Sequence, residues 1–191
     1  MGAAETPIPE AARACVARYP LCFVASINED GSPNLSPKGT IRVWDASHLV
    51  FAQIASPQTA ANVKRDDRVE VNVVDHFARR GWRFRGRAVV TDDAAIVEAL
   101  RQEYPDEPYP FTEAVMIRVE DAREVISPSY SLGYTEDELR EQMRARADTQ
   151  TVESGLLGVR AGAVCLRCEV ARIDRTESAD GLCDECRSAP A

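Results

Sequence analysis

Four cysteines near the end of the chain form the pattern that most directly indicates a chemical site. Cys165 and Cys168 form one Cys-x-x-Cys pair, and Cys183 and Cys186 form a second, with fourteen residues between the pairs. Two such pairs can direct four thiolates at one ion, and a four-sulfur shell is typical of structural zinc. The segment is too short to bury a core of its own, so a metal would supply the missing stability. We therefore expect one structural zinc ion bound by these four cysteines.

Other outcomes remain open for this tail. Iron in a rubredoxin-like site is the main alternative metal, although the glycine and proline that usually accompany rubredoxin cysteines are absent. Four reduced, metal-free thiols or two disulfides are the alternatives without metal. The two remaining cysteines and the two histidines are not expected to take part in chemistry. Cys15 and Cys22 have apolar neighbours and are predicted to be buried thiols, whereas His48 and His76 stand alone and are expected at the surface or at strand ends.

Short runs of apolar or alternating residues, bounded by turn residues, indicate the elements that carry these groups. They predict about six strands, over residues 21–27, 34–44, 48–54, 69–75, 82–90 and 114–119 together with 123–126. Helical patterns are fewer, over residues 9–19, 56–64 and 94–103 and from Thr135 onward. Such spacing favours an antiparallel barrel over an alternating strand–helix sheet. We expect a mainly β fold, a six-stranded antiparallel split barrel with short helices and a small C-terminal four-cysteine metal knuckle.

The clearest alternation occurs in the run from Trp82 to Val90. Trp82, Phe84, Gly86 and Ala88 fall on one face, and Arg83, Arg85 and Arg87 fall on the other. The first set is predicted to be core and the second to face solvent. Further along, the chain becomes poorer in pattern. We therefore expect a barrel domain over residues 1–148, a linker over 149–164 and the four-cysteine tail over 165–191.

The overall composition limits the possible functions. The chain has 191 residues, 45% of them hydrophobic, and a net charge of −8. An acidic chain is a poor candidate for sequence-independent nucleic-acid binding, which depends on neutralising phosphates. No stretch has the length and apolarity of a transmembrane helix, and the first residues lack the pattern of a signal peptide. We expect a cytoplasmic protein that binds neither nucleic acid nor membrane.

Four segments, taken in order and spacing, carry a family resemblance. They are FVASINEDGSPNLSPKGT (23–40), LVFAQIASPQTAANVKRDDRVEVNVVD (49–75), GWRFRGRAVV (81–90) and ISPSYSLGYTEDELREQ (126–142). Together they resemble the FMN-binding proteins of the pyridoxamine 5′-phosphate oxidase-like family, over about residues 10–146. The resemblance implies a six-stranded split barrel, a homodimer and FMN bound at the dimer interface.

The resemblance also implies which residues contact the cofactor. They are Pro37, Lys38, Gly39, Thr40, Ser56, Gln58, Thr59 and Asn62. Physical reasoning agrees, because a helix that starts at Ser56 would offer unpaired backbone N–H groups and hydroxyls to a phosphate. Lys38 would supply positive charge. Without the resemblance, the same residues would read as a capped surface helix and a solvated lysine. The arginines at 83, 85 and 87 offer an alternative phosphate site.

The expected activity follows from the cofactor and not from a catalytic triad. A flavin carries out hydride or electron transfer, and the protein binds and orients it. We expect an FMN-dependent oxidoreductase that acts on a small molecule. A non-catalytic FMN-binding or sensing protein and a reductase that uses the deazaflavin F420 are the alternatives. Oxidation of pyridoxamine phosphate itself is not expected, because the tail lacks the tryptophan that the true oxidase uses there and carries cysteines instead.

Overall fold

The computed structural model describes residues 7–104 and 109–153, with side chains up to residue 146. Within these residues the strands are β1 (Cys22–Ile27), β2 (Pro33–Lys38), β3 (Arg42–Val43), β4 (His48–Ala52), β5 (Arg68–Asp75), β6 (Arg80–Thr91) and β7 (Ala114–Ile126). The helices are α1 (Glu10–Arg18), α2 (Pro57–Arg65), α3 (Ala94–Glu103), the short 3₁₀ helix η1 (Pro128–Leu132) and α4 (Glu136–Glu153). The prediction of a mainly β fold with short helices is confirmed.

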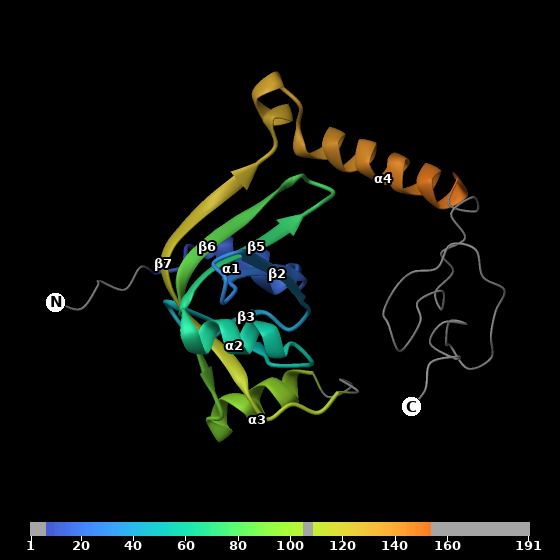
Figure 1. Cartoon of the computed structure of the whole chain (residues 1–191). Helices are drawn as coiled ribbons and strands as arrows, with labels where there is room; N and C mark the ends of the chain where they lie inside the picture. Colours follow the sequence, from blue (N-terminus) through green and yellow to red (C-terminus); the bar gives the residue numbers. More distant parts are fainter. Residues whose placement is uncertain (1–6, 105–108, 154–191) are drawn as a thin grey trace, which may run out of the picture. The chain divides into compact units, whose positions relative to one another are not determined.

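All of these strands pair antiparallel in one sheet, in the order β2-β1-β5-β6-β7-β4-β3. Strands β2 and β3 are the two edges of this sheet, yet only residues 39–41 connect them. The four steps from Lys38 to Arg42 span at most about 14 Å. The two edges must therefore approach each other, and the sheet curls into a half-barrel (Figure 1).

The expected number of strands is wrong by one. The run 34–44 was predicted as a single strand, but it forms β2 and β3, which lie at opposite edges of the sheet. Residues 39–41 leave the pairing with β1 before the pairing with β4 begins. Composition does not reveal this break, because a connecting segment between two edges can be as extended and as apolar as a strand.

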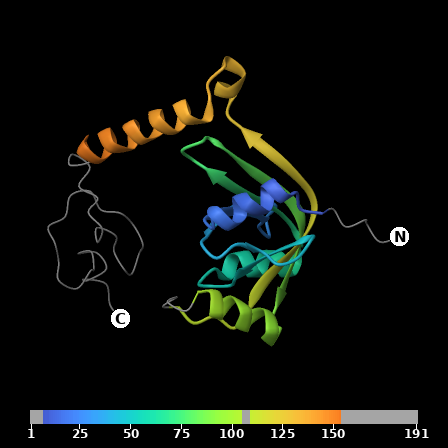
Figure 2. The ribbon, with the colours of Figure 1, turned by 180° about the vertical axis from the view of Figure 1, so that it is seen from behind.

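The main core lies on the inner face of the curled sheet. Figure 2 shows α1 on the near side of the strands, seen from behind. Helix α1 packs on β3, β5 and β6, and α2 packs on β1 and β6. The predicted alternation in β6 is confirmed, since Phe84 and Ala88 are buried in this core while Arg83, Arg85 and Arg87 are exposed. Burying such aliphatic and aromatic side chains contributes about 1.5–3 kcal/mol each.

A second, smaller core lies between α3 and the outer side of β4 and β7. Val50 and Ala114 of the strands pack there with Val97 and Leu100 of the helix. Helix α3 begins where the sequence predicts, because the Asp93 side chain accepts hydrogen bonds from the backbone N–H groups of residues 95 and 96. This helix covers one end of the outer face, and the outer sides of β1, β5 and β6 carry exposed residues.

Gly86 marks a close approach between β6 and β7. A β-carbon at this position would lie 2.2 Å from the backbone oxygen of Arg118. The register of the two strands also shifts between Arg85 and Gly86, which is the mark of a β-bulge. Glycine is therefore required here by contact with the neighbouring backbone.

The chain divides into two units, Met1–Asp137 and Glu138–Ala191. The first contains the whole sheet. The second begins within α4, and residues 154–191, including Cys165, Cys168, Cys183 and Cys186, lie outside the described residues. The structure therefore does not test the metal knuckle. In the residues described, no helix is long and apolar enough to cross a membrane.

Candidate functional site

Two segments that the sequence marks as cofactor-binding lie next to each other in the fold. The hydroxyl oxygen of Thr40 accepts a hydrogen bond from the backbone N–H of Ala52 at 3.0 Å. Thr40 belongs to the connection between β2 and β3, and Ala52 ends β4, from which the chain turns into α2. This contact therefore places the segment 37–40 beside the turn that leads to α2.

The N-terminus of α2 carries no side-chain cap. Ser56 occupies the N-cap position and Pro57 the first turn, as predicted, but Ser56 makes no capping hydrogen bond. Its hydroxyl instead donates to the side-chain oxygen of Gln53 at 3.0 Å, and Gln53 donates back to the backbone oxygen of Ser56 at 2.7 Å. Ser56 therefore holds the N-cap position without capping the helix through its side chain. The backbone N–H groups of the first turn are left available to an anion.

The turn before α2 is strained. Ala55 has a positive φ of 44°, in the left-handed region that non-glycine residues rarely adopt. Gln53 holds this turn by bonding across it to Ser56. Such strained conformations cost about 1–3 kcal/mol and cluster at ligand-binding sites. The strain turns the chain so that α2 begins directly beyond the end of β4.

Thr59 stands in the first turn of α2. Its side chain is buried, with 1% of the residue exposed. Its hydroxyl is a hydrogen-bond donor beside the N–H groups of the helix start, so an anion bound there would accept hydrogen bonds from both. At Gly39, a β-carbon would meet no atom within 4 Å, so the space beside this residue is open.

Asn62 has a different environment from the other residues of α2 that the resemblance marks. It is fully buried, and its amide nitrogen donates to the Ser26 hydroxyl at 3.0 Å and to the Asn28 side-chain oxygen at 2.9 Å. Its oxygen accepts a hydrogen bond from Gln58 at 2.9 Å. These contacts attach α2 to the hairpin between β1 and β2. The Asn62 amide therefore has protein partners on both of its polar atoms.

Pro37 and Lys38 point to opposite sides of β2. Pro37 is exposed and pairs with Phe23 on the outer face, whereas Lys38 is buried and pairs with Cys22 on the inner face. The ammonium nitrogen of Lys38 lies 5.7 Å above the centre of the Phe51 ring. Burial lowers the pKa of Lys38. The resemblance marked Lys38 as a cofactor-binding residue, but the sequence did not show that its side chain is buried on the inner face of the sheet.

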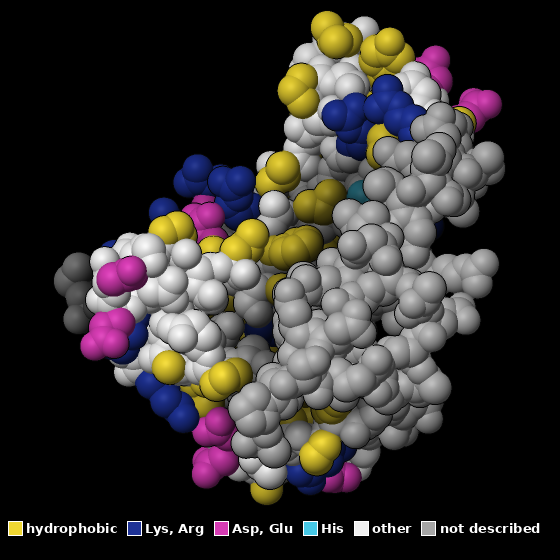
Figure 3. All heavy atoms as spheres, turned by 45° about the vertical axis from the view of Figure 1, so that its right-hand side comes forward, with side chains coloured by type: hydrophobic (Ala, Val, Ile, Leu, Met, Phe, Trp, Pro, Cys, Tyr) yellow, Lys and Arg dark blue, Asp and Glu magenta, His cyan; other side chains and the backbone are white. Residues whose placement is uncertain are grey.

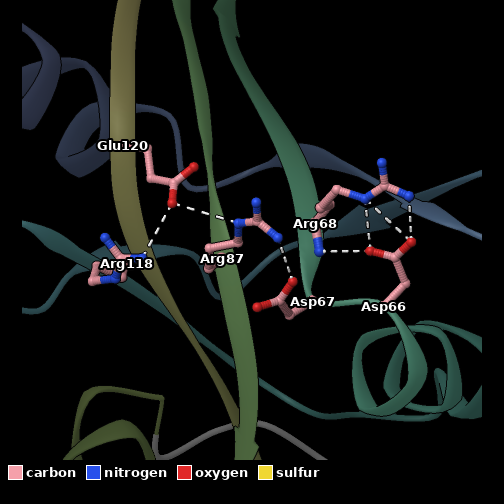
Figure 4. A network of polar contacts seen from close by, with 6 residues as sticks. All are labelled: Asp66, Asp67, Arg68, Arg87, Arg118 and Glu120. Carbon is pink, nitrogen blue, oxygen red and sulfur yellow. Dashed lines mark hydrogen bonds and ion pairs between the residues drawn. The ribbon is translucent and has the colours of Figure 1, made fainter. Parts of the chain in front are cut away.

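Several arginines on the outer face pair with carboxylates, among them Arg87 and Arg118 (Figure 4). Arg87 bonds to Asp67 at 2.8 Å and lies 3.5 Å from Glu120, which also pairs with Arg118 at 3.1 Å. Arg83 lies 3.9 Å from Glu70. Because the carboxylates already balance much of this charge, this face is a weaker phosphate site than the N-terminus of α2.

Sequence reasoning missed several residues of this region. Gln53 shapes the turn before α2, and Ser36 and Phe51 surround the Lys38 amine. His48 does not stand alone, because its Nδ1 lies 2.9 Å from a carboxylate oxygen of Asp45. The spacing of Asp45 and His48 across a predicted hairpin could have indicated that pair. No pattern in the sequence indicated the contacts of Lys38 with Ser36 and Phe51.

No metal site is found in the part of the chain that the structure describes. Residues 7–104 and 109–153 contain no group of three or more His, Cys, Asp or Glu side chains placed to hold an ion. Cys22 is fully buried, and burial raises the pKa of its thiol to about 12. The prediction of a buried thiol is therefore confirmed for Cys22, whereas Cys15 is only partly buried.

Comparison with protein-family models gives one match. The model described as pyridoxamine 5′-phosphate oxidase matches residues 8–126, which include every strand of the sheet. A search of curated proteins found no match.

Solved structures share the fold. The chain is similar to HupZ of Group A Streptococcus, with 25% identity, a TM-score of 0.58 and coverage of 63% of this chain and 95% of HupZ. It is also similar to an FMN-binding protein of Syntrophomonas wolfei, with 13% identity, a TM-score of 0.55 and coverage of 62% and 86%. An F420 reductase shows 21% identity, a TM-score of 0.50 and coverage of 61% of this chain and 98% of that protein. The similarity to the latter two proteins is evidence for a shared fold alone.

Proposed function

Because the chain belongs to the pyridoxamine 5′-phosphate oxidase family, we propose that it binds FMN beside the N-terminus of α2 and acts as a flavin-dependent oxidoreductase on a small molecule. The observation that carries this proposal is the start of α2, which no side chain caps and whose first turn holds the buried Thr59. This combination fits a phosphate monoester, which needs several hydrogen-bond donors and a favourable dipole.

The residues of the site have separate tasks in this proposal. The Thr59 hydroxyl and the first N–H groups of α2 hold the phosphate, and Ser56 with Gln53 fixes the turn that exposes those groups. The segment 37–40, with open space at Gly39, borders the cofactor. When bound, the flavin supplies hydride or electron transfer. Asn62 and Gln58 hold α2 against the β1–β2 hairpin.

The test compares FMN with riboflavin, which lacks the phosphate, by fluorescence quenching. FMN should bind more tightly, and Thr59→Val should weaken FMN binding by about 1–2 kcal/mol, or ~5- to 30-fold, because one hydrogen bond to a charged group is lost. Riboflavin binding should not change. Thr112→Val, at an exposed position, is the matched control. Equal affinity of the wild-type protein for FMN and riboflavin would contradict this site.

The same fluorescence assay compares the affinity for FMN with the affinity for the deazaflavin F420. F420 has a longer anionic tail and would need further basic residues, yet two of the three outer-face arginines of β6, Arg83 and Arg87, are paired with carboxylates. We therefore propose FMN over F420, and tighter binding of F420 would reverse that choice. Rapid reduction of the bound flavin by NADH or NADPH, followed by transfer to an acceptor, would separate an oxidoreductase from a non-catalytic binding protein.

We also propose that the protein is a homodimer. On the outer face, Phe23 of β1 and Leu35 of β2 are 45% and 66% exposed. Hydrophobic side chains are also visible among charged ones on the face drawn in Figure 3. The side-chain oxygen of Asn72, which pairs with Phe23 across β1 and β5, is buried without a hydrogen-bond partner in the described residues. A second subunit packed on this face would cover the apolar side chains and supply a donor.

The C-terminal cysteines belong to the proposal as a separate structural site. The spacing of Cys165, Cys168, Cys183 and Cys186 predicts one zinc ion with four thiolate ligands. Four protein ligands leave no open position for a substrate, so this site would stabilise the tail and take no part in flavin chemistry.

A further inference from the structure

Lysine is rare in this chain, and one of its lysines is buried. Of the 23 Lys and Arg residues, two are lysines, Lys38 and Lys64. The side chain of Lys64 is 58% exposed and pairs with Glu113 at 3.2 Å. Lys38 is 6% exposed. Arginine stays charged at any physiological pH, whereas lysine can lose its proton when buried. The chain thus places an amine that can titrate at an interior position.

The contacts of the Lys38 amine are all with neutral groups. Its nitrogen donates to the hydroxyl of Ser36 on the same strand and to the backbone oxygen of Pro37 at 3.3 Å. The Phe51 ring of β4 lies beneath it. In the described part of the chain, none of the ion pairs within 4 Å includes Lys38. An ammonium group at this place has no counter-ion.

The ionisable groups around Lys38 do not change this conclusion. Across β1, Cys22 faces Lys38, and its thiol remains protonated because burial raises its pKa to about 12. Tyr104, which follows α3, interacts with Cys22, and burial raises its pKa as well. Arg42 of β3 acts on Tyr104 and is itself paired with Glu103. No neighbouring group therefore supplies a negative charge at neutral pH.

A buried charge without a partner is costly, and a protein avoids this cost by releasing the proton or by binding an anion. Burial indeed lowers the pKa of Lys38. We propose that Lys38 takes up a proton from solvent when the phosphate dianion of the cofactor binds beside the segment 37–40. The amine becomes an ammonium, and the arriving phosphate becomes its counter-ion. This inference rests on the proposed FMN site, and it adds that cofactor binding is coupled to protonation.

The low number of lysines allows a direct measurement on the wild-type protein. Lysine labelled with an NMR-active isotope at the ε carbon gives one signal each for Lys38 and Lys64, and a Lys64→Arg variant assigns them. In the cofactor-free protein, the Lys38 signal should titrate at lower pH than the Lys64 signal. Adding FMN should raise the midpoint of Lys38 alone. Riboflavin, which has no phosphate, should leave this midpoint unchanged.

Binding measurements give an independent readout. Between the midpoint of Lys38 in the free protein and its higher midpoint in the complex, the Kd for FMN should rise ~10-fold per pH unit, because binding in this range takes up one proton. The useful range begins at about pH 7.5, where the phosphate is already a dianion. Calorimetry in two buffers of different ionisation enthalpy should show the uptake of about one proton per FMN. Lys38→Arg, which stays charged, should bind FMN without this pH dependence.

The outcomes separate this inference from the proposed function. If FMN binds but the Lys38 signal titrates with that of Lys64, or its midpoint does not respond to FMN, the coupling is wrong and the FMN site stands. If riboflavin shifts the midpoint as much as FMN does, the phosphate is not the partner of Lys38. If FMN does not bind under any condition, the proposed function fails and the inference fails with it. The NMR arm needs no variant at Lys38, so a folding defect in Lys38→Arg does not affect it.

Discussion

Replacing Asn62 by alanine separates a structural role of this residue from a cofactor-binding role. The family resemblance places Asn62 at the cofactor, but in the fold its amide is fully buried and bonded to the β1–β2 hairpin. We expect Asn62→Ala to destabilise the cofactor-free protein strongly. Because α2 would lose two of its hydrogen bonds to the β1–β2 hairpin, the effect should appear in the free energy of unfolding before any cofactor is added.

The magnitude follows from the contacts. Asn62 makes three hydrogen bonds of 2.9–3.0 Å, two as donor to Ser26 and Asn28 and one as acceptor from Gln58. Each contributes about 0.5–1.5 kcal/mol. Ser26 keeps a hydrogen bond from Asn34 at 3.1 Å, so it is not left without a partner. Together with the small cavity left by the amide, the expected loss is about 2–4 kcal/mol.

Urea unfolding of the cofactor-free protein measures this loss. Gln58→Ala is the matched control, because Gln58 is exposed on the same helix and contributes one of the same hydrogen bonds. It should cost less than about 1 kcal/mol. A double-mutant cycle with Ser26→Ala should show a coupling energy of about 0.5–1.5 kcal/mol between Ser26 and Asn62.

The reasoning would be refuted by the opposite pattern. If Asn62→Ala unfolds at the same urea concentration as the wild-type protein but loses FMN, then Asn62 contacts the cofactor and its hydrogen bonds to the hairpin contribute little. If both stability and affinity fall, FMN binding measured at low urea, where the variant is fully folded, shows whether the loss of affinity exceeds the loss of folded protein.

Three further predictions concern the fold, the assembly and the tail. Gly86→Ala should destabilise the protein by more than about 3 kcal/mol in the same unfolding assay, because its β-carbon would lie 2.2 Å from a backbone oxygen, whereas Gly39→Ala, with open space around it, should change stability by less than about 0.5 kcal/mol. Light scattering should show a dimer that Leu35→Asp converts to a monomer with weaker FMN binding, while Leu132→Asp, at a 78% exposed position, leaves it dimeric; a wild-type monomer that retains FMN would contradict the dimer. Elemental analysis should find about one zinc per chain, lost in Cys183→Ser while FMN is kept, and a folded, reduced protein without metal would contradict the zinc site.

Local patterns in the sequence were sufficient to predict the type of most elements. The alternation around Phe84 predicted which face of β6 is buried, and the helical patterns over 56–64 and 94–103 predicted the positions of α2 and α3. These signals are reliable because they reflect short-range constraints, namely the two-residue period of a strand and the unpaired N–H groups at a helix start. The mainly β class followed from the number and spacing of such runs.

Only the tertiary structure decided how the site is assembled. Whether Lys38 faces the interior depends on its pairing with Cys22, and whether Asn62 is available to a ligand depends on Ser26, 36 residues earlier in the chain. The break at residues 39–41 likewise depends on the curling of the sheet, which brings its two edges together. A sequence pattern records the preferences of neighbouring residues, whereas burial, orientation and hydrogen-bond partners are set by strands that are distant in sequence, since a shift of one residue in their register would turn each side chain to the opposite face.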